Sequence, residues 1–218
     1  MQFDEIIKNS GLEQDFPKLE SPFIREETEK GYVCTKKIDN RSRWVFTKEC
    51  TAVEKLDGTN TSILVENNRL TRIMNRKNII EPFSKQGKPF TIGILEAIEK
   101  DYFKLEGGQH FGELMGKTIN GNFLELDSYI WLPFSLMLTR NKYKFWDNLE
   151  FENKSDEEIY EITSNIFKDL WSLEYRRRYG KIKPAEGIVF YRIIDNKMTE
   201  LCKLRRDMFD WFEGRRHT

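Results

Sequence analysis

The sequence predicts an α+β protein in which antiparallel sheets are flanked by helices. Short β-prone runs, separated by charged turns, fill much of the 218-residue chain. Two other segments carry apolar residues at helical spacing. The two kinds of segment are interspersed without the strict βαβ alternation of a doubly wound parallel sheet, which favours the α+β class. The length suits one domain with a sizeable core and a small appendage.

We expect residues 1–30 to form a polar N-terminal extension that packs on a core domain of residues 31–218. The extension contains two breaks, at Phe16-Pro17 and Ser21-Pro22, and the pattern changes to β-prone runs from Gly31 onward.

β-branched and aromatic runs predict strands in the first half of the core. They are Tyr32–Thr35, Trp44–Thr47, Thr51–Val53, Ser62–Val65 and Leu70–Met74. The last two flank Glu66-Asn67-Asn68-Arg69, which is typical of a hairpin turn because asparagine tolerates positive φ.

The second half mixes both kinds of element. Helices are predicted at Thr91–Phe103 and at residues 156–178, the second opened by a capping box from Ser155 to Glu158. Strands are predicted within the aromatic-rich block Gln109–Leu138, and at Gly187–Ile194 and Glu200–Leu204.

Composition excludes several classes of protein. No apolar run approaches the roughly 20 residues that cross a bilayer, and Met1–Glu5 lacks the basic and apolar regions of a secretory signal. Three widely spaced cysteines and two histidines favour reduced thiols over disulfides, structural zinc or a multi-histidine site. We therefore expect a cytoplasmic protein. The 36 basic and 36 acidic residues balance, so any nucleic-acid surface must be local.

Charged residues interrupt four β-prone stretches. The first is Lys55-Leu56-Asp57-Gly58-Thr59-Asn60, and the others are Phe111–Gly116, Ala185–Phe190 and Leu201–Arg205. A charged side chain on the inner face of a strand is costly unless it is paired, liganded or catalytic. Four such interruptions indicate a shared polar site.

In order, composition and spacing, these stretches resemble motifs I, III, IV and V of the covalent nucleotidyltransferase superfamily, the ATP-dependent ligases and mRNA-capping guanylyltransferases. The resemblance extends from Lys55 to Phe209. It implies the ligase/capping-enzyme nucleotidyltransferase fold, and a lysine that forms a phosphoramidate with a nucleotide.

The residue types suit that chemistry. A lysine amine that attacks an α-phosphate must be unprotonated, although its free pKa is about 10.4. Nearby cations disfavour the charged form, so Lys203, Arg205 and a bound Mg²⁺ or Mn²⁺ are expected to lower the pKa of Lys55 and to neutralise the triphosphate. Gly58 is expected to let the turn approach the phosphate closely.

The resemblance also assigns roles by position. Lys55, Lys203, Arg205 and Asp57 are the expected catalytic residues, and Glu186 and Asp57 the expected metal ligands. Glu113 resembles the glutamate that holds a ribose hydroxyl, Arg76 an arginine that contacts nucleotide or a 5′-phosphate, and Phe134 the base platform, for which core packing is an equal alternative. The full set expected to bind the cofactor ATP is Lys55, Glu54, Asn60, Arg76, Glu113, Phe134, Glu186 and Lys203.

Gly58-Thr59-Asn60 and Ala185-Glu186-Gly187 are most similar to the RNA ligase 2-like group, with Arg205 in place of a lysine. The chain is expected to lack the C-terminal OB-fold domain of the other branches. Tyr175–Lys183 mixes aromatic residues and cations, as surfaces that follow a nucleic-acid backbone do, or alternatively supplies favourable charge at a helix C-terminus.

The sequence therefore predicts a monomeric, ATP-dependent RNA ligase with no membrane partner. Its substrate is expected to be RNA, as nicked duplex, tRNA ends or single strands. A GTP-dependent capping-type guanylyltransferase, a small ligase that acts on DNA or mixed nicks, and a non-catalytic module that binds nucleotide or nucleic-acid ends are the alternatives.

Overall fold

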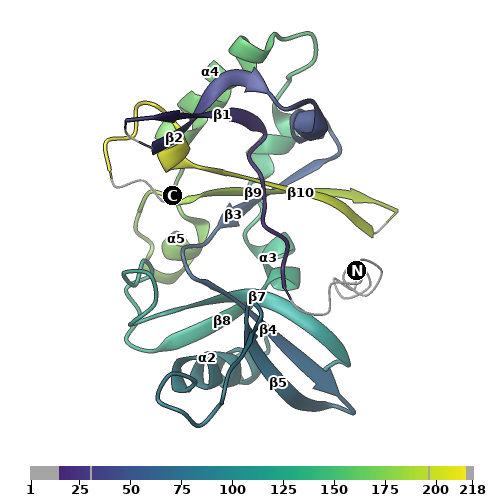
Figure 1. Ribbon diagram of the computed structural model, residues 1–218, viewed down its shortest axis with the longest axis vertical. Coiled ribbons are helices and arrows are strands. Elements are labelled where there is room, and N and C mark those ends of the chain that lie inside the picture. The colour runs from purple at the N-terminus through teal and green to yellow at the C-terminus, as the bar shows by residue number, and fades with distance from the viewer. Residues whose placement is uncertain (1–14, 30, 196, 215–218) are drawn as a thin grey trace. The chain divides into compact units, whose positions relative to one another are not determined.

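The computed structural model describes residues 15–29, 31–195 and 197–214. The chain divides into two compact units (Figure 1). Unit 1 comprises Met1–Lys18 and Asp57–Arg140, and unit 2 comprises Leu19–Leu56 and Asn141–Thr218. The α+β class with antiparallel sheets is confirmed, since every strand pair in the described residues is antiparallel. No helix in this part of the chain is long and apolar enough to cross a membrane.

Unit 2 contains a two-stranded sheet, β1-β2, and a three-stranded sheet in the order β10-β9-β3. Its strands are β1 (Phe23–Thr28), β2 (Gly31–Ile38), β3 (Cys50–Lys55), β9 (Gly187–Ile194) and β10 (Lys197–Arg205). Its helices are α4 (Asp156–Lys168), α5 (Leu173–Tyr179) and the short 3₁₀ helices η1 (Asn40–Phe46), η2 (Lys144–Asn148) and η3 (Arg206–Met208).

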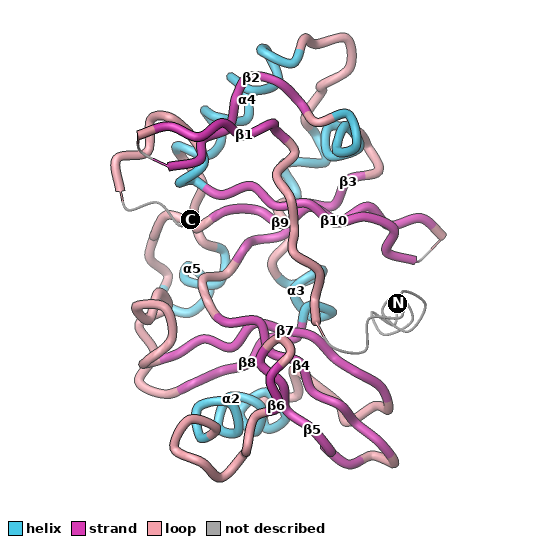
Figure 2. The backbone as a smooth tube through the Cα atoms, viewed as in Figure 1, coloured by secondary structure: helices cyan, strands magenta, loops and turns pink. Residues whose placement is uncertain are grey.

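Unit 1 contains a five-stranded sheet in the order β6-β5-β4-β7-β8. Figure 2 shows α2 lying along one side of this sheet. The elements are β4 (Thr59–Glu66), β5 (Arg69–Asn75), β6 (Asn78–Ile79), α2 (Lys88–Glu99), β7 (Gly108–Gly116), β8 (Tyr129–Pro133) and α3 (Phe134–Arg140).

Each unit has its own apolar core around a buried tryptophan. In unit 1 the fully buried Trp131 donates its indole N–H to the carbonyl of Thr61 at 3.1 Å. In unit 2 Trp146 donates to the carbonyl of Val45, also at 3.1 Å, and packs against Phe190. Burial of such large rings, with the polar N–H satisfied, stabilises both cores.

Three cysteines lie in the core of unit 2. Cys34, Cys50 and Cys202 are free thiols, and all three are buried. Burial raises the pKa of Cys202 to about 11, so this thiol is protonated and unreactive near neutral pH.

The predicted hairpin between β4 and β5 is confirmed. Asn67 and Asn68 occupy its turn with φ values of 52° and 58°, the left-handed conformation that asparagine tolerates best after glycine. The predicted helix at Thr91–Phe103 is present as α2, but it begins at Lys88, with Pro89 in its first turn, and ends at Glu99 rather than at Phe103.

The N-terminal segment and two predicted strands differ from expectation. Phe23–Thr28, within the predicted extension, is a strand that pairs with β2, whereas residues 1–14 and 30 lie outside the described residues. The predicted strand Trp44–Thr47 lies mainly in η1, because the Asp39 carboxylate caps that helix by accepting the N–H of Arg41. The strand block predicted to reach Leu138 ends at Pro133, where α3 begins.

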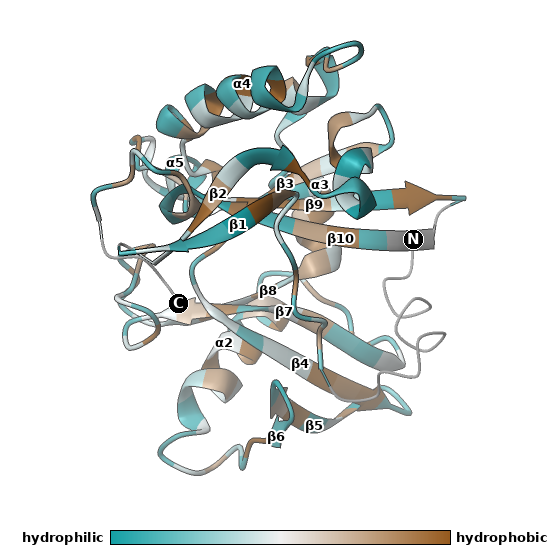
Figure 3. Ribbon diagram, turned by 45° about the horizontal axis from the view of Figure 1, so that its top comes forward, coloured by the Kyte–Doolittle hydropathy of each residue, from teal (hydrophilic) through white to brown (hydrophobic). Residues whose placement is uncertain are grey.

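The single helix predicted at residues 156–178 is two helices, α4 and α5. Ser172 interrupts it by adopting an extended backbone conformation, and its hydroxyl accepts the N–H of Tyr175 to start α5. Polar and apolar residues alternate along α4 in Figure 3, in keeping with one buried face.

The capping box of α4 is confirmed and gives a stability test. Ser155 Oγ accepts the N–H of Glu158 at 3.2 Å, and Glu158 Oε2 accepts the N–H of Ser155 at 2.8 Å. Ser155→Ala removes the first bond and should lower the free energy of unfolding by about 1 kcal/mol in urea titrations. Ser155→Asp retains a capping acceptor and is expected to stay near wild type; equal stability of all three proteins would contradict this role.

Candidate active site

Three predicted catalytic residues project from one face of the sheet β10-β9-β3 in unit 2. Lys55, at the end of β3, lies opposite Gly187, and Gly187 lies opposite Arg205 of β10. Directly opposed residues of antiparallel strands share a face, and so do residues two apart on one strand. Lys55, Lys203 and Arg205 are therefore on the same face.

The ammonium group of Lys55 forms an ion pair with Glu186, the residue before β9. Lys55 Nζ lies 2.6 Å from Glu186 Oε2, and the two side chains are 21% and 14% exposed. The structure thus brings together the lysine expected to be the nucleophile and the glutamate expected to bind metal. A carboxylate this close favours the charged form of an amine.

Positive charge gathers around this ion pair. Burial lowers the pKa of Lys203, and the positive charges of Arg205 and Lys55 lower it further. Arg205 is itself held by Asp207, with Nε 2.8 Å from Oδ1. The predicted cationic field is therefore present, although Glu186 opposes it at Lys55.

Gly187 allows the three strands to approach at this point. A Cβ atom there would lie 2.2 Å from the carbonyl oxygen of Leu204, too close for any side chain. A larger residue would push β10 away and displace Lys203 and Arg205. Close packing of the strands therefore explains why the predicted motif IV has glycine at position 187.

Glu54 lies on the opposite face from Lys55 and is fully buried. Its Oε2 accepts hydrogen bonds from Asn141 Nδ2 and from the N–H of Glu174, both at 2.8 Å, and its Oε1 accepts one from the Ser172 hydroxyl. Burial raises the pKa of Glu54, and these three donors partly offset that rise. The carboxylate is engaged within the protein, so a nucleotide contact by Glu54 stays a prediction.

The partners of Glu54 were not anticipated from the sequence. Asn141 follows α3, and Ser172 and Glu174 belong to the start of α5. Only the position of Ser172 as a helix cap was a readable signal. Their common contact with the residue before Lys55 emerges from the tertiary structure.

In unit 1, two residues expected to bind the cofactor are direct neighbours. Asn60 of β4 pairs with Glu113 of β7, so both side chains lie on one face of the five-stranded sheet. Asn60 Oδ1 is buried and has no hydrogen-bond partner among the described residues. A buried acceptor without a donor is costly, which suits a position that a ligand completes.

Gly58 brings the turn after Lys55 against β7. A Cβ atom at Gly58 would lie 2.5 Å from the carbonyl of Leu114 and 2.7 Å from Cγ of Glu113. The structure therefore requires glycine here for contact with β7, whereas the expected approach to phosphate stays a prediction. Asn120 fixes the same turn, since its Nδ2 donates to Asp57 Oδ1 at 3.2 Å and to the carbonyl of Gly58.

Arg76 and Phe134 occupy other parts of unit 1. Arg76 lies in the turn after β5 with a φ of 53°, strained for arginine. Its guanidinium is 3.9 Å from Asp15 Oδ2. Phe134 is buried at the start of α3, and its ring meets that of Phe16 edge-on at 4.8 Å. That contact favours the core-packing alternative, and the role as a base platform stays a prediction.

Phe209, in unit 2, is a core residue that stacks on Trp211.

The donor chemistry at Glu186 fits a magnesium or manganese ion. Its carboxylate already holds a cation, the Lys55 ammonium. Mg²⁺ prefers oxygen ligands, and one or two carboxylates suffice because water and substrate phosphates complete its shell. The described residues contain no cluster of three or more His, Cys, Asp or Glu that is suited to a metal ion. Glu186 and Asp57 therefore both stay predicted metal ligands.

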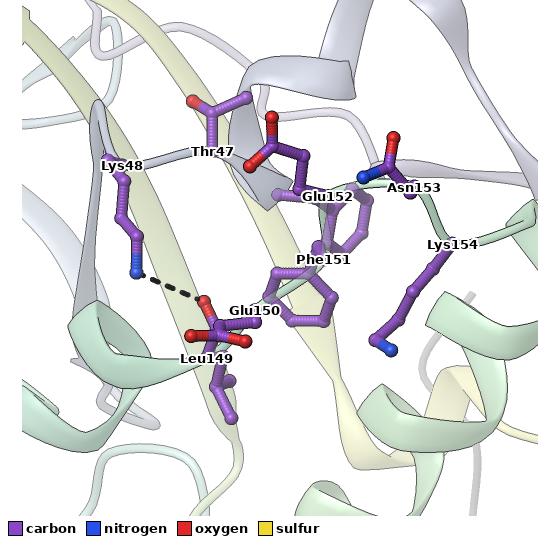
Figure 4. A pocket seen from close by; sticks show the side chains of 9 residues that line it. Thr47, Lys48, Leu149, Glu150, Phe151, Glu152, Asn153 and Lys154 are labelled. Carbon is purple, nitrogen blue, oxygen red and sulfur yellow. Dashed lines mark hydrogen bonds between the residues drawn. The ribbon is translucent and has the colours of Figure 1, made fainter.

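A cavity of about 580 Å³ lies elsewhere in unit 2, lined by residues 46–48 and 149–154. Figure 4 shows Lys48 at its edge, with the ammonium group directed at the carbonyl of Leu149. None of the predicted site residues lines this cavity. Neither Lys55 nor Glu186 contributes to its wall.

A lysine paired with a glutamate and bordered by two further cations defines a site suited to phosphoryl-group chemistry. A family comparison agrees. The RNA ligase family model matches residues 48–205, well over half of the chain, and the chain belongs to this family.

Solved structures give looser likenesses. An RNA ligase of Naegleria gruberi with pyrophosphate is 16% identical, with a TM-score of 0.47, over 88% of this chain and 58% of that one. A mutant of that enzyme with ATP and Mn has 16% identity and a TM-score of 0.46 over the same shares. The chain thus spans 58% of the length of these structures. No curated protein is significantly similar in sequence.

The lowered pKa of Lys203 predicts that the stability of the folded protein depends on pH. Lys203→Met removes a half-buried positive charge that faces Arg205 and Lys55, so the variant should melt at a higher temperature than wild type at pH 7. The unfolded chain keeps the Lys203 proton up to about pH 10.5, whereas the folded protein releases it earlier. Wild-type stability therefore increases as the pH rises from the pKa of folded Lys203 towards about 10.5. The difference in melting temperature between Lys203→Met and wild type should become smaller over the same pH range.

Thermal melts of both proteins from pH 7 to 10.5 measure this difference. Lys48→Met, at an exposed lysine elsewhere in unit 2, controls for the loss of one charge. The lowered pKa of Lys203 would be contradicted if the two melting temperatures were equal at pH 7, or if their difference increased as the pH rises.

Proposed function

We propose that this protein is an ATP-dependent RNA ligase of the RNA ligase 2-like group, which joins 5′-phosphate and 3′-hydroxyl ends. The observation that carries the proposal is the Lys55–Glu186 ion pair on a sheet face that also bears Lys203 and Arg205. Membership of the RNA ligase family supports the same reaction class.

The first step is transfer of AMP to Lys55. The amine nitrogen, after losing a proton, attacks the α-phosphorus of ATP and forms a P–N bond. The bond from that phosphorus to the oxygen bridging to the β-phosphate breaks, and its electron pair leaves with pyrophosphate. The amine releases a second proton to solvent, and lysyl-AMP remains.

The residues around Lys55 suit this step. Glu186, 2.6 Å from Nζ, holds the amine in place at the end of β3. Lys203 and Arg205 supply positive charge that favours the neutral amine and balances the phosphates. A metal ion bound at Glu186 would add to this charge balance by screening the triphosphate. We propose ATP with Mg²⁺ or Mn²⁺ as the cofactors, because a carboxylate next to several cations suits a metal-bound triphosphate.

Within unit 1, Asn60, Glu113 and Arg76 are proposed to contact a nucleotide. The unpaired Oδ1 of Asn60 and the neighbouring Glu113 are suited to hydroxyl and amino donors of a nucleoside. Arg76, 63% exposed, is available to a phosphate. Asp57 and Phe134 keep their sequence-based roles as metal ligand and base platform within this proposal.

The later steps move AMP onward. A 5′-phosphate oxygen attacks the phosphorus of lysyl-AMP, the P–N bond breaks and Lys55 regains its protons, leaving an A(5′)pp(5′)N end. A 3′-hydroxyl oxygen then attacks the 5′-phosphorus, AMP departs, the hydroxyl proton is released and a phosphodiester forms.

Covalent labelling tests the proposal. With α-labelled ATP and Mg²⁺, wild-type protein should retain label after denaturation, and the label should be acid-labile, as a P–N bond is. Lys55→Ala and Lys55→Arg should both abolish labelling, because neither provides an amine at that position. Lys36→Ala, at an exposed lysine paired with Glu157, should label like wild type.

Separate incubations with labelled GTP distinguish a capping-type enzyme. A panel of 5′-phosphorylated RNA and DNA ends then shows which strands the labelled protein joins. Retention of label by Lys55→Ala would overturn the proposal, as would labelling by GTP alone or joining of DNA only.

A further inference from the structure

Residues 171–184 form a closed loop on unit 2 that contains α5. The N–H of Ser172 donates to the carbonyl of Lys183 at 2.8 Å, and Trp171 forms an isolated antiparallel bridge with Pro184. Gly180 ends α5 in the left-handed conformation, with a φ of 64°. The loop is thus fixed at its base and presents its outer residues to solvent.

Several cations of this segment have structural partners. Arg177 and Arg178 contact the buried Glu174, at 2.5 and 2.9 Å. The Lys183 ammonium lies 4.9 Å from the centre of the Tyr175 ring. These three explain part of the basic run as internal stabilisation of α5.

Arg176 and Lys181 are different. Both are exposed, and among the described residues neither has an acidic partner. Favourable charge at the C-terminus of a short helix accounts for Arg176 alone, since Lys181 lies beyond it. Two unneutralised cations remain on the loop of a chain whose formal charge is zero.

The same loop carries exposed apolar side chains. Trp171 is 41% exposed, Tyr179 40% and Ile182 63%. Exposed aromatic rings interleaved with cations are the composition of surfaces that bind single-stranded nucleic acid, where bases stack on rings and phosphates meet lysine and arginine. We name Trp171, Arg176, Tyr179, Lys181 and Ile182 the α5 surface.

We propose that the α5 surface binds a single-stranded segment of RNA. Arg176 and Lys181 contact its phosphates, and Trp171 and Tyr179 stack on its unpaired bases. A duplex would satisfy the cations but would keep its base faces stacked and away from the rings. The inference rests on the proposed function, since it assigns the strand that a ligase would join.

The same segment is tied to the lysine site within unit 2. Ser172 and Glu174, at the start of α5, hold the carboxylate of Glu54, the residue before Lys55. At its other end the loop leads through Ala185 into Glu186, the ion-pair partner of Lys55. An RNA strand on the α5 surface would therefore lie on a loop that contacts Glu54 at its start and leads into Glu186 at its end.

Fluorescence anisotropy with a labelled, 5′-phosphorylated single-stranded RNA tests the proposal at several salt concentrations. Arg176→Ala/Lys181→Ala should weaken binding and lower the slope of log K against log salt by roughly 1.4, the release expected for two phosphate contacts to a single strand. Lys37→Ala/Lys144→Ala is the matched control and should bind like wild type, because both lysines are exposed in unit 2 and neither has an acidic partner among the described residues.

Trp171→Leu keeps apolar bulk without a stacking face. It should bind the single strand about tenfold more weakly and leave binding of the same sequence as a duplex unchanged. Because it differs from the charge variants in chemistry, it keeps the proposal testable if the double variant folds poorly. Labelling of Lys55 by ATP should be normal in both sets, because no α5-surface residue belongs to the lysine site.

The outcomes separate this inference from the proposed function. Loss of RNA binding with normal Lys55 labelling supports the α5 surface. The α5-surface proposal is overturned if the double variant and Trp171→Leu both bind RNA as well as wild type does. It is also overturned if the wild-type protein binds no RNA, or if the α5 surface binds only protein. If no nucleotide labels the wild type, the proposed function fails, and the anisotropy comparison still decides the α5 surface.

Discussion

The ion pair between Lys55 and Glu186 is the contact on which the interpretation of this protein depends. It joins the end of β3 to the start of β9, and β9 is the central strand that also pairs with β10. Gly187 permits that three-strand contact, because no side chain fits between β9 and the backbone of Leu204. The lysine, the glutamate and the two cations of β10 therefore keep their relative positions as long as this sheet is intact.

The opposite face of β3 explains why Lys55 is held so firmly. Glu54 is buried with three donors from Asn141, Ser172 and the backbone of Glu174. A buried carboxylate with satisfied oxygens is costly to move, since each lost bond leaves an unpaired charge in the core. The network thus fixes the strand on one face, Lys55 lies on the other, and the hydrogen bonds of Glu54 connect the strand to α5.

The sequence carried the local features well. The four motif stretches singled out Lys55, Glu186, Lys203 and Arg205; the structure places them at one end of the sheet β10-β9-β3, and their roles stay predictions. The capping box and the asparagine hairpin were also readable, because their determinants lie within a few residues. The break between α4 and α5 was missed because Ser172 is stabilised by Lys183 and Glu54, which are distant in sequence. Likewise, only the fold shows that Arg177 and Arg178 serve Glu174 whereas Arg176 and Lys181 do not.

Peptide mapping of the nucleotide adduct decides whether Lys55 is the nucleophile. Protein incubated with ATP and Mg²⁺ is digested without exposure to acid, and the peptides are analysed by mass spectrometry. We expect one added AMP on the peptide that contains Lys55, with fragment ions placing it on that side chain. An adduct on any other lysine, Lys203 included, or an unmodified Lys55 in protein that joins RNA ends, would contradict it.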